Sequence, residues 1–275
     1  MTLRTSPKVL LSVIGIAVSL VFLSPYLVML FTSLKPFGEL ALSPARLLPI
    51  NWDPSSYITM WSAAPVGQYL VNSLIVASAS TAIVLAIAIP AAYATARFAF
   101  RGRRVYLFGM LIVQMLAPVA LIVGIYREFS ALGLLDSLIG LIIINSAFNL
   151  AFAVWLMRAF ITTIPVELEE AAWLDGCSRF TALTRVLFPV IRPGVVTVGI
   201  YSFIASWNEF IVALTLITTE ANKPLQVGLT QFIGRDSVQW QHLFATSLIA
   251  IVPVAILFLL VEKHLVGGLT SGSVK

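Results

Sequence analysis

Residues 138–157 read LIGLIIINSAFNLAFAVWLM, a run that contains no charged side chain. A helix needs roughly 20 mainly apolar residues to cross the hydrocarbon of a bilayer. Five further windows have the same character, although the fourth of them carries Glu209, and they cover residues 9–31, 69–96, 105–126, 194–217 and 243–261. The sequence therefore predicts an all-α, polytopic membrane protein with six transmembrane helices, folded as a single transmembrane domain over residues 1–275.

Composition excludes several other classes of protein. The chain is 59% hydrophobic and only 11% charged, whereas about a quarter of the residues of a soluble domain are charged. Its net charge of +5 is spread between apolar runs, without the basic, aromatic-rich cluster typical of nucleic-acid binding. No hydrolase or metal motif is present, and Cys177 is the single cysteine. We therefore expect neither an enzyme nor a metal protein.

The distribution of basic residues predicts the orientation. An even number of spans places both termini on one side, and taking that side as cytoplasmic puts 12 of the 17 Lys and Arg residues inside. The cluster between Arg97 and Arg104, beside two spans, dominates this positive-inside signal. The sequence thus predicts a multi-pass protein with cytoplasmic termini.

The cytoplasmic segment 158–193 is longer than a connection needs. Thr162 and Thr163 can cap a helix, and three glutamates after Pro165 suit the positive end of its dipole. Gly176 can adopt the left-handed conformation that ends this helix, Ser178 can cap a second one, and Pro189 is expected to stop it. The segment predicts a helix, a glycine corner and another helix.

The spacing within this segment resembles the EAA loop of ABC importer permeases. It reads Glu170-Ala171-Ala172, three residues, Gly176, nine residues, Val186, one residue, then Phe188-Pro189. The family pattern ends Ile-x-Leu-Pro, so Val186 and Phe188 are apolar departures. Asp175, Trp207-Asn208-Glu209-Phe210 and the ending from Val266 to Gly272 also resemble the maltose-type carbohydrate group, specifically its second permease subunit.

The resemblance implies a role and partners. The chain would be the permease of an ATP-driven importer of a carbohydrate or related polyol in the bacterial inner membrane. It would work with a second permease, two ATPase subunits and an extracytoplasmic solute-binding protein. It would hold no cofactor itself, because ATP and Mg belong to the ATPases. The coupling residues are then Glu170, Ala171, Ala172, Asp175, Gly176 and Pro189. The tail residues Gly267, Gly268, Leu269 and Thr270 would also contact the ATPase.

Polar residues inside spans are costly and therefore mark candidate sites. These residues are Gln114, Asn145, Asn149, Trp207, Asn208 and Glu209. Amides suit hydroxyl-rich solutes, and Trp207 could stack on a sugar. Hydrogen bonding between helices is an equal alternative for Asn145 and Asn149.

Three other functions remain open at this point. A lone intramembrane carboxylate, Glu209, would also suit an ion-coupled secondary transporter. An ABC permease for a non-sugar solute such as glycerol phosphate, or a purely structural membrane scaffold, would share the apolar pattern.

Overall fold

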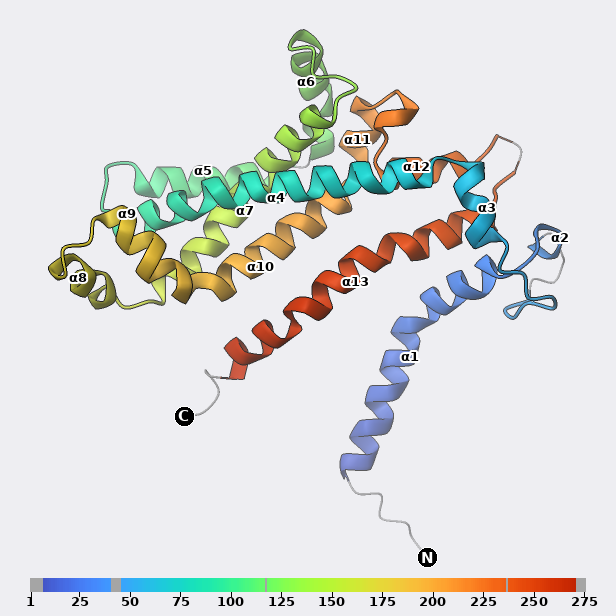
Figure 1. Ribbon diagram of the computed structural model, residues 1–275, viewed down its shortest axis with the longest axis horizontal. Coiled ribbons are helices and arrows are strands. Elements are labelled where there is room, and N and C mark those ends of the chain that lie inside the picture. Colours follow the sequence, from blue (N-terminus) through green and yellow to red (C-terminus); the bar gives the residue numbers. More distant parts are fainter. Residues whose placement is uncertain (1–6, 41–45, 117, 236, 271–275) are drawn as a thin grey trace, which may run out of the picture. The chain divides into compact units, whose positions relative to one another are not determined.

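The computed structural model describes residues 7–40, 46–116, 118–235 and 237–270 (Figure 1). Within these ranges the chain is helical, and its one β pairing is an isolated bridge between Ile233 and Val238. The all-α prediction is confirmed. The helices in chain order are α1 Pro7–Ser33, α2 Phe37–Leu40, α3 Ser56–Ala63, α4 Val66–Arg97, α5 Arg103–Met115, α6 Pro118–Ala131, α7 Leu138–Thr162, α8 Glu167–Leu174, α9 Arg179–Thr181, η1 Ala182–Leu187, α10 Phe188–Trp207, α11 Ile211–Leu216, η2 Glu220–Asn222, α12 Leu225–Gly228, η3 Leu229–Phe232 and α13 Trp240–Thr270.

Five helical stretches in the described residues are long and apolar enough to cross a membrane, and a bent pair makes the sixth if it counts as one span. That pair is α5 and α6, whose axes differ by 96°. The window 105–126 was expected to form one helix. Instead α6 begins at Pro118, where the missing amide hydrogen of proline favours a new helix start.

The fifth span begins earlier in the chain than the sequence suggested. A continuous helical stretch runs from Arg179 to Trp207, and it includes the π-helical turn η1. The predicted window 194–217 is interrupted at residues 208–210, after which α11 begins at Ile211. This break places Glu209 between two helices.

Large apolar side chains cover the outside of several helices. Within the described part of α1, Phe22 is 73% exposed, and on α5 Met115 is 85% exposed. No residue of α5 is buried. Water would disfavour such surfaces, and either lipid or a partner helix suits them.

The chain divides into two compact units. The first comprises Met1–Val66 and Leu229–Val252. Within its described residues, Ser33 on α1 hydrogen-bonds the hydroxyl of Tyr57 at 2.8 Å, and Thr59 on α3 hydrogen-bonds His242 on α13 at 2.9 Å. These contacts join α3 to both long helices of this unit.

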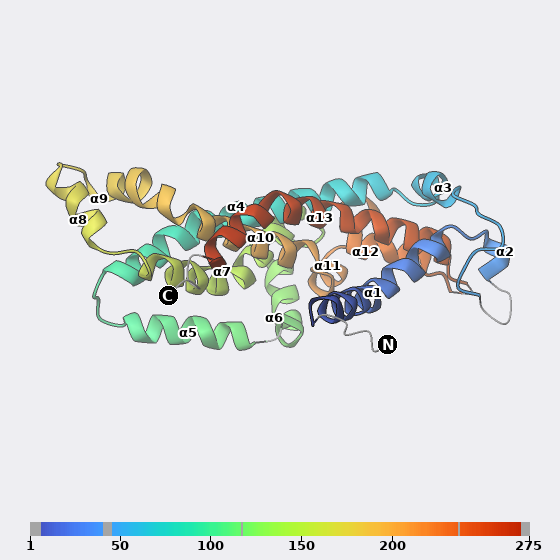
Figure 2. The same cartoon turned by 90° about the horizontal axis from the view of Figure 1, so that it is seen from below.

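The second unit, Gly67–Gly228 with Pro253–Lys275, contains the main core. Here α4, α7 and α10 lie along one another (Figures 1 and 2). Small residues allow this close approach: Gly194 on α10 faces the ring of Phe160 on α7, and Ala88 and Ala92 on α4 are fully buried. The core residues are Val84, Ala88, Ala92, Tyr93, Ala153, Val154, Met157, Ile161, Leu187, Ile191 and Val198.

Asp136 fixes the connection between α6 and α7. Its carboxylate accepts hydrogen bonds from the backbone of Thr218 and Thr219 and from the Thr219 hydroxyl. The hydroxyl of Thr219 lowers the pKa of Asp136 below its ordinary value, since it stabilises the charged form. The backbone of Asp136 has φ +53°, a left-handed conformation that aspartate tolerates better than most residues.

The contact between Gly194 and Phe160 gives a stability prediction. A Cβ added at Gly194 would lie 2.6 Å from the Phe160 ring, whereas one at Gly199 would lie 3.4 Å from a methyl group of Leu85. Gly194→Ala should lower the free energy of unfolding by about 1 to 3 kcal/mol through overpacking. Gly199→Ala, on the same helix, should be neutral or slightly stabilising. Thermal melting in detergent compares the two, and equal melting temperatures would contradict the packing described here.

Candidate functional site

The first candidate site is the segment from α8 to η1. Helix α8 begins at Glu167 after Val166, with Glu167, Glu169 and Glu170 in its first turn. This start was predicted, but the expectation that Thr162 and Thr163 cap the helix is wrong, since α8 has no side-chain cap. The hydroxyls of Thr162 and Thr163 donate back to carbonyls of α7, at Ala159 and Phe160. The exposed carboxylates of Glu167 and Glu170 in the first turn suit the positive end of the helix dipole.

The glycine corner forms as the sequence predicted. Gly176 has φ +84°, and the amide of Cys177 donates to the carbonyl of Ala172 at 2.9 Å. This hydrogen bond closes the C-terminus of α8 in the way that a left-handed residue allows. The hydroxyl of Ser178 then accepts from the amide of Thr181 at 3.2 Å and caps α9.

The expectation that Pro189 stops the second helix is wrong. The chain continues from α9 through η1 into α10, and Pro189 lies at one of the first two positions of α10. A proline there does not leave a needed hydrogen bond unmade, and the π-helical turn before it absorbs the change of register. The second helix of this segment is therefore continuous with a stretch long and apolar enough to span a membrane.

Helix α8 has one exposed and one buried face. Glu170, Ala171 and Asp175 are exposed, and the side chain of Leu174 is 89% exposed. Ala172 is buried against the protein. An apolar side chain surrounded by acidic groups suits a protein partner with an apolar pocket and basic rim.

Glu169 is the residue of this segment that sequence reasoning missed. It was assigned only to the helix dipole, but its side chain is fully buried and accepts a hydrogen bond from Arg97 Nε at 2.6 Å. Tyr93 donates its hydroxyl proton to the other carboxylate oxygen at 2.8 Å. Both partners lie on α4, more than 70 residues away in sequence, so the sequence held no local signal for the pairing.

The second candidate site is a cavity of about 200 Å³ in the second unit. It brings together four of the six polar residues that the sequence singled out, namely Gln114, Asn145, Asn149 and Glu209. The remaining lining residues are Val113, Leu116, Pro118, Phe148 and Ala205. A mixture of apolar walls and a few converging polar groups is typical of small-molecule sites.

Hydrogen bonds tie most of these polar groups to the protein. Asn149 donates to the backbone of Asn145 at 2.8 Å and to the hydroxyl of Ser206 on α10 at 3.2 Å. The carboxylate of Glu209 accepts from the amides of Val212 and Ala213, at 2.8 and 2.9 Å. Glu209 therefore caps α11, and Asn149 joins α7 to α10, as the interhelical alternative predicted, whereas Asn145 donates to the carbonyl of Leu141 on its own helix.

Trp207 and Asn208 do not line this cavity. Trp207 is only 2% exposed and stacks on Phe203, with ring centroids 5.8 Å apart. Asn208 is the exposed residue that ends α10. Of the cluster 207–209, only Glu209 lines the cavity, because Trp207 is packed inside the protein and Asn208 is exposed beyond the end of α10.

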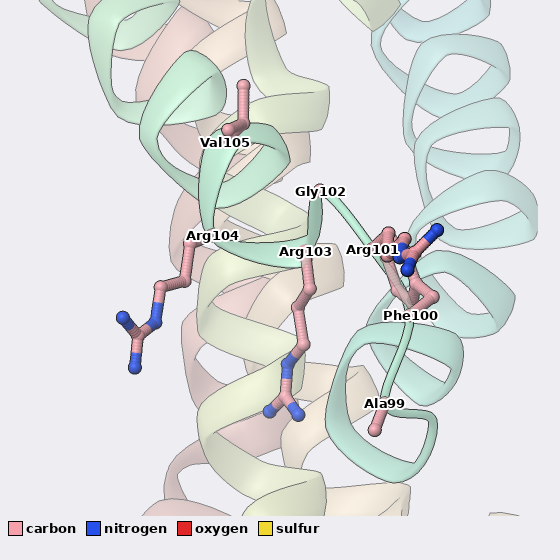
Figure 3. A pocket seen from close by; sticks show the side chains of 7 residues that line it. All are labelled: Ala99, Phe100, Arg101, Gly102, Arg103, Arg104 and Val105. Carbon is pink, nitrogen blue, oxygen red and sulfur yellow. The ribbon is translucent and has the colours of Figure 1, made fainter.

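The basic turn between α4 and α5 forms a wider hollow of about 520 Å³, lined by residues 99–105. Figure 3 shows Arg103 and Arg104 on one side of this turn and Arg101 on the other. The three guanidinium groups do not converge on one point.

The comparisons with known proteins decide the family. Residues 84–267 match the family of binding-protein-dependent transport system inner membrane components. This chain belongs to that family. It is a multi-pass permease subunit of a bacterial ABC importer, a transport component rather than an enzyme, and its partners include an ATPase and a solute-binding protein. The ion-coupled transporter and the structural scaffold are thereby set aside.

Several relatives of this permease cover nearly its whole length. The sulfoquinovosyl glycerol transport system permease of Agrobacterium fabrum is 36% identical over 92% of this chain and 89% of its own. A diacetylchitobiose uptake permease of Streptomyces coelicolor is 31% identical, over 94% and 93%. The trehalose transport permease of Mycobacterium tuberculosis is 31% identical, over 92% of each chain.

A solved structure shares the fold of the permease. A chain in the crystal structure of a bacterial ABC transporter involved in the import of the acidic polysaccharide alginate superposes with a TM-score of 0.80. The match covers 95% of this chain and 99% of the other, at 24% identity. The likeness supports the arrangement of helices described above.

The left-handed conformation of Gly176 gives a prediction about this permease. Gly176→Val should misdirect the chain between α8 and α9, because a β-branched residue resists positive φ at a cost of roughly 1 to 2 kcal/mol or more. Gly176→Asn is the matched control, since asparagine tolerates this conformation. Pull-down of the ATPase in detergent should be weaker for valine than for asparagine. Equal recovery with both variants would show that the corner is dispensable for assembly.

Proposed function

We propose that this chain is the second permease subunit of an importer for a carbohydrate or related polyol. The observation that carries the proposal is the cavity in which Gln114, Asn145 and Asn149 converge beside apolar side chains. Amides both donate and accept hydrogen bonds, as hydroxyl-rich solutes require. Sulfoquinovosyl glycerol, diacetylchitobiose and trehalose, named for three relatives, all carry sugar rings.

In this proposal a second permease completes the pathway, and two ATPase subunits supply the energy from the cytoplasmic side, where both termini lie. Exposed apolar side chains on α1 and α5, such as Phe22 and Met115, provide surface for lipid and for the second permease. ATP and Mg are held by the ATPase subunits, and solute moves by alternating access.

The exposed face of α8 docks against the ATPase. Ala171 lets a partner approach the backbone, Leu174 enters an apolar pocket, and Glu170 pairs with a basic side chain at the rim. Ala172, Asp175, Gly176 and Pro189 shape the segment that presents this face. The tail residues Gly267, Gly268, Leu269 and Thr270 make a second contact; their backbone belongs to α13, and the residues after them lie outside the described part of the chain.

The proposed cargo is tested with the solute-binding protein that accompanies this permease. Trehalose, diacetylchitobiose, other oligosaccharides, polyols and glycerol 3-phosphate are screened for a rise in its melting temperature. A sugar or polyol should raise it, because binding to the native state stabilises by mass action. A rise with glycerol 3-phosphate alone would replace the carbohydrate proposal by its non-sugar alternative.

The cavity gives a matched pair of variants. Asn149→Ala should lower uptake of the solute found in that screen by roughly two- to tenfold, the range that corresponds to one hydrogen bond of about 0.5 to 1.5 kcal/mol. Asn208→Ala removes the same amide outside the cavity and should leave uptake unchanged. Recovery of assembled complex must be equal for both variants. If uptake is unimpaired in the Asn149→Ala variant, Asn149 does not bind the solute and only connects α7 to α10.

Charge reversal tests the docking face. Glu170→Lys should weaken docking of the ATPase by more than tenfold, because truncating one partner of a buried charge pair typically costs about 2 to 5 kcal/mol. The control is Glu128→Lys, which changes the net charge by the same amount at an exposed position on α6. Detergent pull-down and ATP hydrolysis in proteoliposomes are the measurements. If the Glu170→Lys variant docks as well as the wild type, Glu170 does not contribute to the interface with the ATPase.

A further inference from the structure

Adjacent glutamates at the start of α8 have opposite environments. Glu170 is exposed, whereas the side chain of Glu169 has no exposed surface and that of Arg97 has 9%. A carboxylate so placed loses its hydration, and only good geometry with several hydrogen bonds compensates for that loss. Because burying this ion pair costs solvation free energy, its presence indicates a specific link between α8, which carries Glu169, and α4, which carries Arg97.

The link has three hydrogen bonds, and all its donors come from one face of α4. Tyr93 and Arg97 are four residues apart, so their side chains lie on the same side of the helix. Each occupies a different oxygen of Glu169. Arg97 Nη2 also donates to the carbonyl of Ile164, 2.9 Å away, in the chain that leads into α8. Tyr93, Arg97 and Glu169 are together called the clamp below.

A second contact stabilises the same end of α4. The guanidinium of Arg179 on α9 lies over the ring of Phe98, 5.0 Å from its centroid, and over the ring of Trp173 on α8, at 4.8 Å. Phe98 in turn packs edge-on against Tyr93 at 5.8 Å. The clamp is therefore surrounded by stacked side chains from both ends of the glycine corner, which limits rotation of α8 about its own axis.

Helix α4 extends far from the clamp. Its 32 residues span about 48 Å at a rise of 1.5 Å per residue. Near its other end, Asn72 donates to the carbonyls of Ala221 and Lys223, and the hydroxyl of Ser73 accepts from the amide of Leu225. Between these ends α4 packs against α7 and α10, which carry part of the cavity lining.

We propose that the clamp makes α8 and α4 move as one body, so that α4 carries displacement of α8 into the membrane. Tyr93 and Arg97 are positioning residues that act through Glu169. This inference rests on the proposed docking of α8 against the ATPase and adds the route by which docking reaches the cavity. The covalent route through Gly176 leads to α10, and the clamp supplies a second route to α4.

The test uses a reporter in the cavity and needs no solute. Cys177→Ser removes the single cysteine of the chain, and Ala205→Cys places a thiol in the cavity wall. The complete importer is reconstituted, and alkylation by N-ethylmaleimide is timed with and without a non-hydrolysable ATP analogue. With the clamp intact, the nucleotide should change the alkylation rate.

Glu169→Gln keeps the size of the side chain but removes its charge. It should bind the ATPase and the nucleotide normally while the nucleotide-dependent change in alkylation falls by roughly fivefold or more, the lower end of typical coupling between sites. Tyr93→Phe should cause a smaller loss in the same direction. The double variant Arg97→Glu with Glu169→Arg should restore part of the response. Glu167→Gln, an exposed glutamate of the same turn, is the control and should leave the response unchanged.

Each contrary outcome is informative. A full nucleotide response with Glu169→Gln would overturn the proposal, and so would loss of ATPase docking in that variant, because the clamp would then shape the docking surface rather than transmit its motion. If neither Glu169→Gln nor the exchanged pair assembles, the clamp is a folding requirement and the proposal fails. The Glu170→Lys variant distinguishes failure of the proposed docking from failure of the clamp, because its pull-down measures docking directly and does not need the cysteine in the cavity.

Discussion

Hydrocarbon offers a peptide group no hydrogen-bond partner, and this constraint governs where the chain can leave the helical conformation. The break after α10 shows how the constraint is met. Glu209 lies at the break, and its two carboxylate oxygens accept the amides of Val212 and Ala213, which no preceding turn of α11 can satisfy. In the segment that follows α11, Asp136 accepts from the amide of Thr219, and Asn72 donates to the carbonyl of Ala221. Glu209 and Asn149, two polar residues within apolar runs, therefore bond the protein itself as well as lining the cavity.

This dual use explains why the cavity residues were predictable as a group but not in their contacts. Polar side chains inside apolar runs are conspicuous in a sequence, and four of them line one cavity. Their hydrogen bonds depend on the neighbouring helices, as the bond from Asn149 to Ser206 on α10 illustrates. Trp207 failed as a cavity residue for the same reason, because its burial against Phe203 follows from the rotation of α10, which no local pattern specifies.

Local features of the backbone were predicted best. Gly176 and Ser178 act through their own conformation or a hydrogen bond to a residue three positions away, and such effects are readable from short sequences. Expectations that required knowledge of the surroundings failed. Pro189 would end an isolated helix, but the π-helical turn before it accommodates the ring. The window 105–126 has the composition of one span, yet Pro118 begins a helix whose axis differs from that of α5 by 96°.

The pair Glu169 and Glu170 shows why the coupling role proposed for this segment needs more than an exposed docking face. Held only by its chain connections, residues 163–166 toward α7 and Gly176 toward α9, α8 could pivot about them, and part of a force applied to its outer face would be lost in rotation. Fixing a second point converts the same force into displacement of whatever holds that point. In this chain the second point is the end of α4, where Tyr93 and Arg97 bind Glu169. Because successive helical residues point about 100° apart, two consecutive glutamates are enough to place one carboxylate on the proposed docking face and the other against α4.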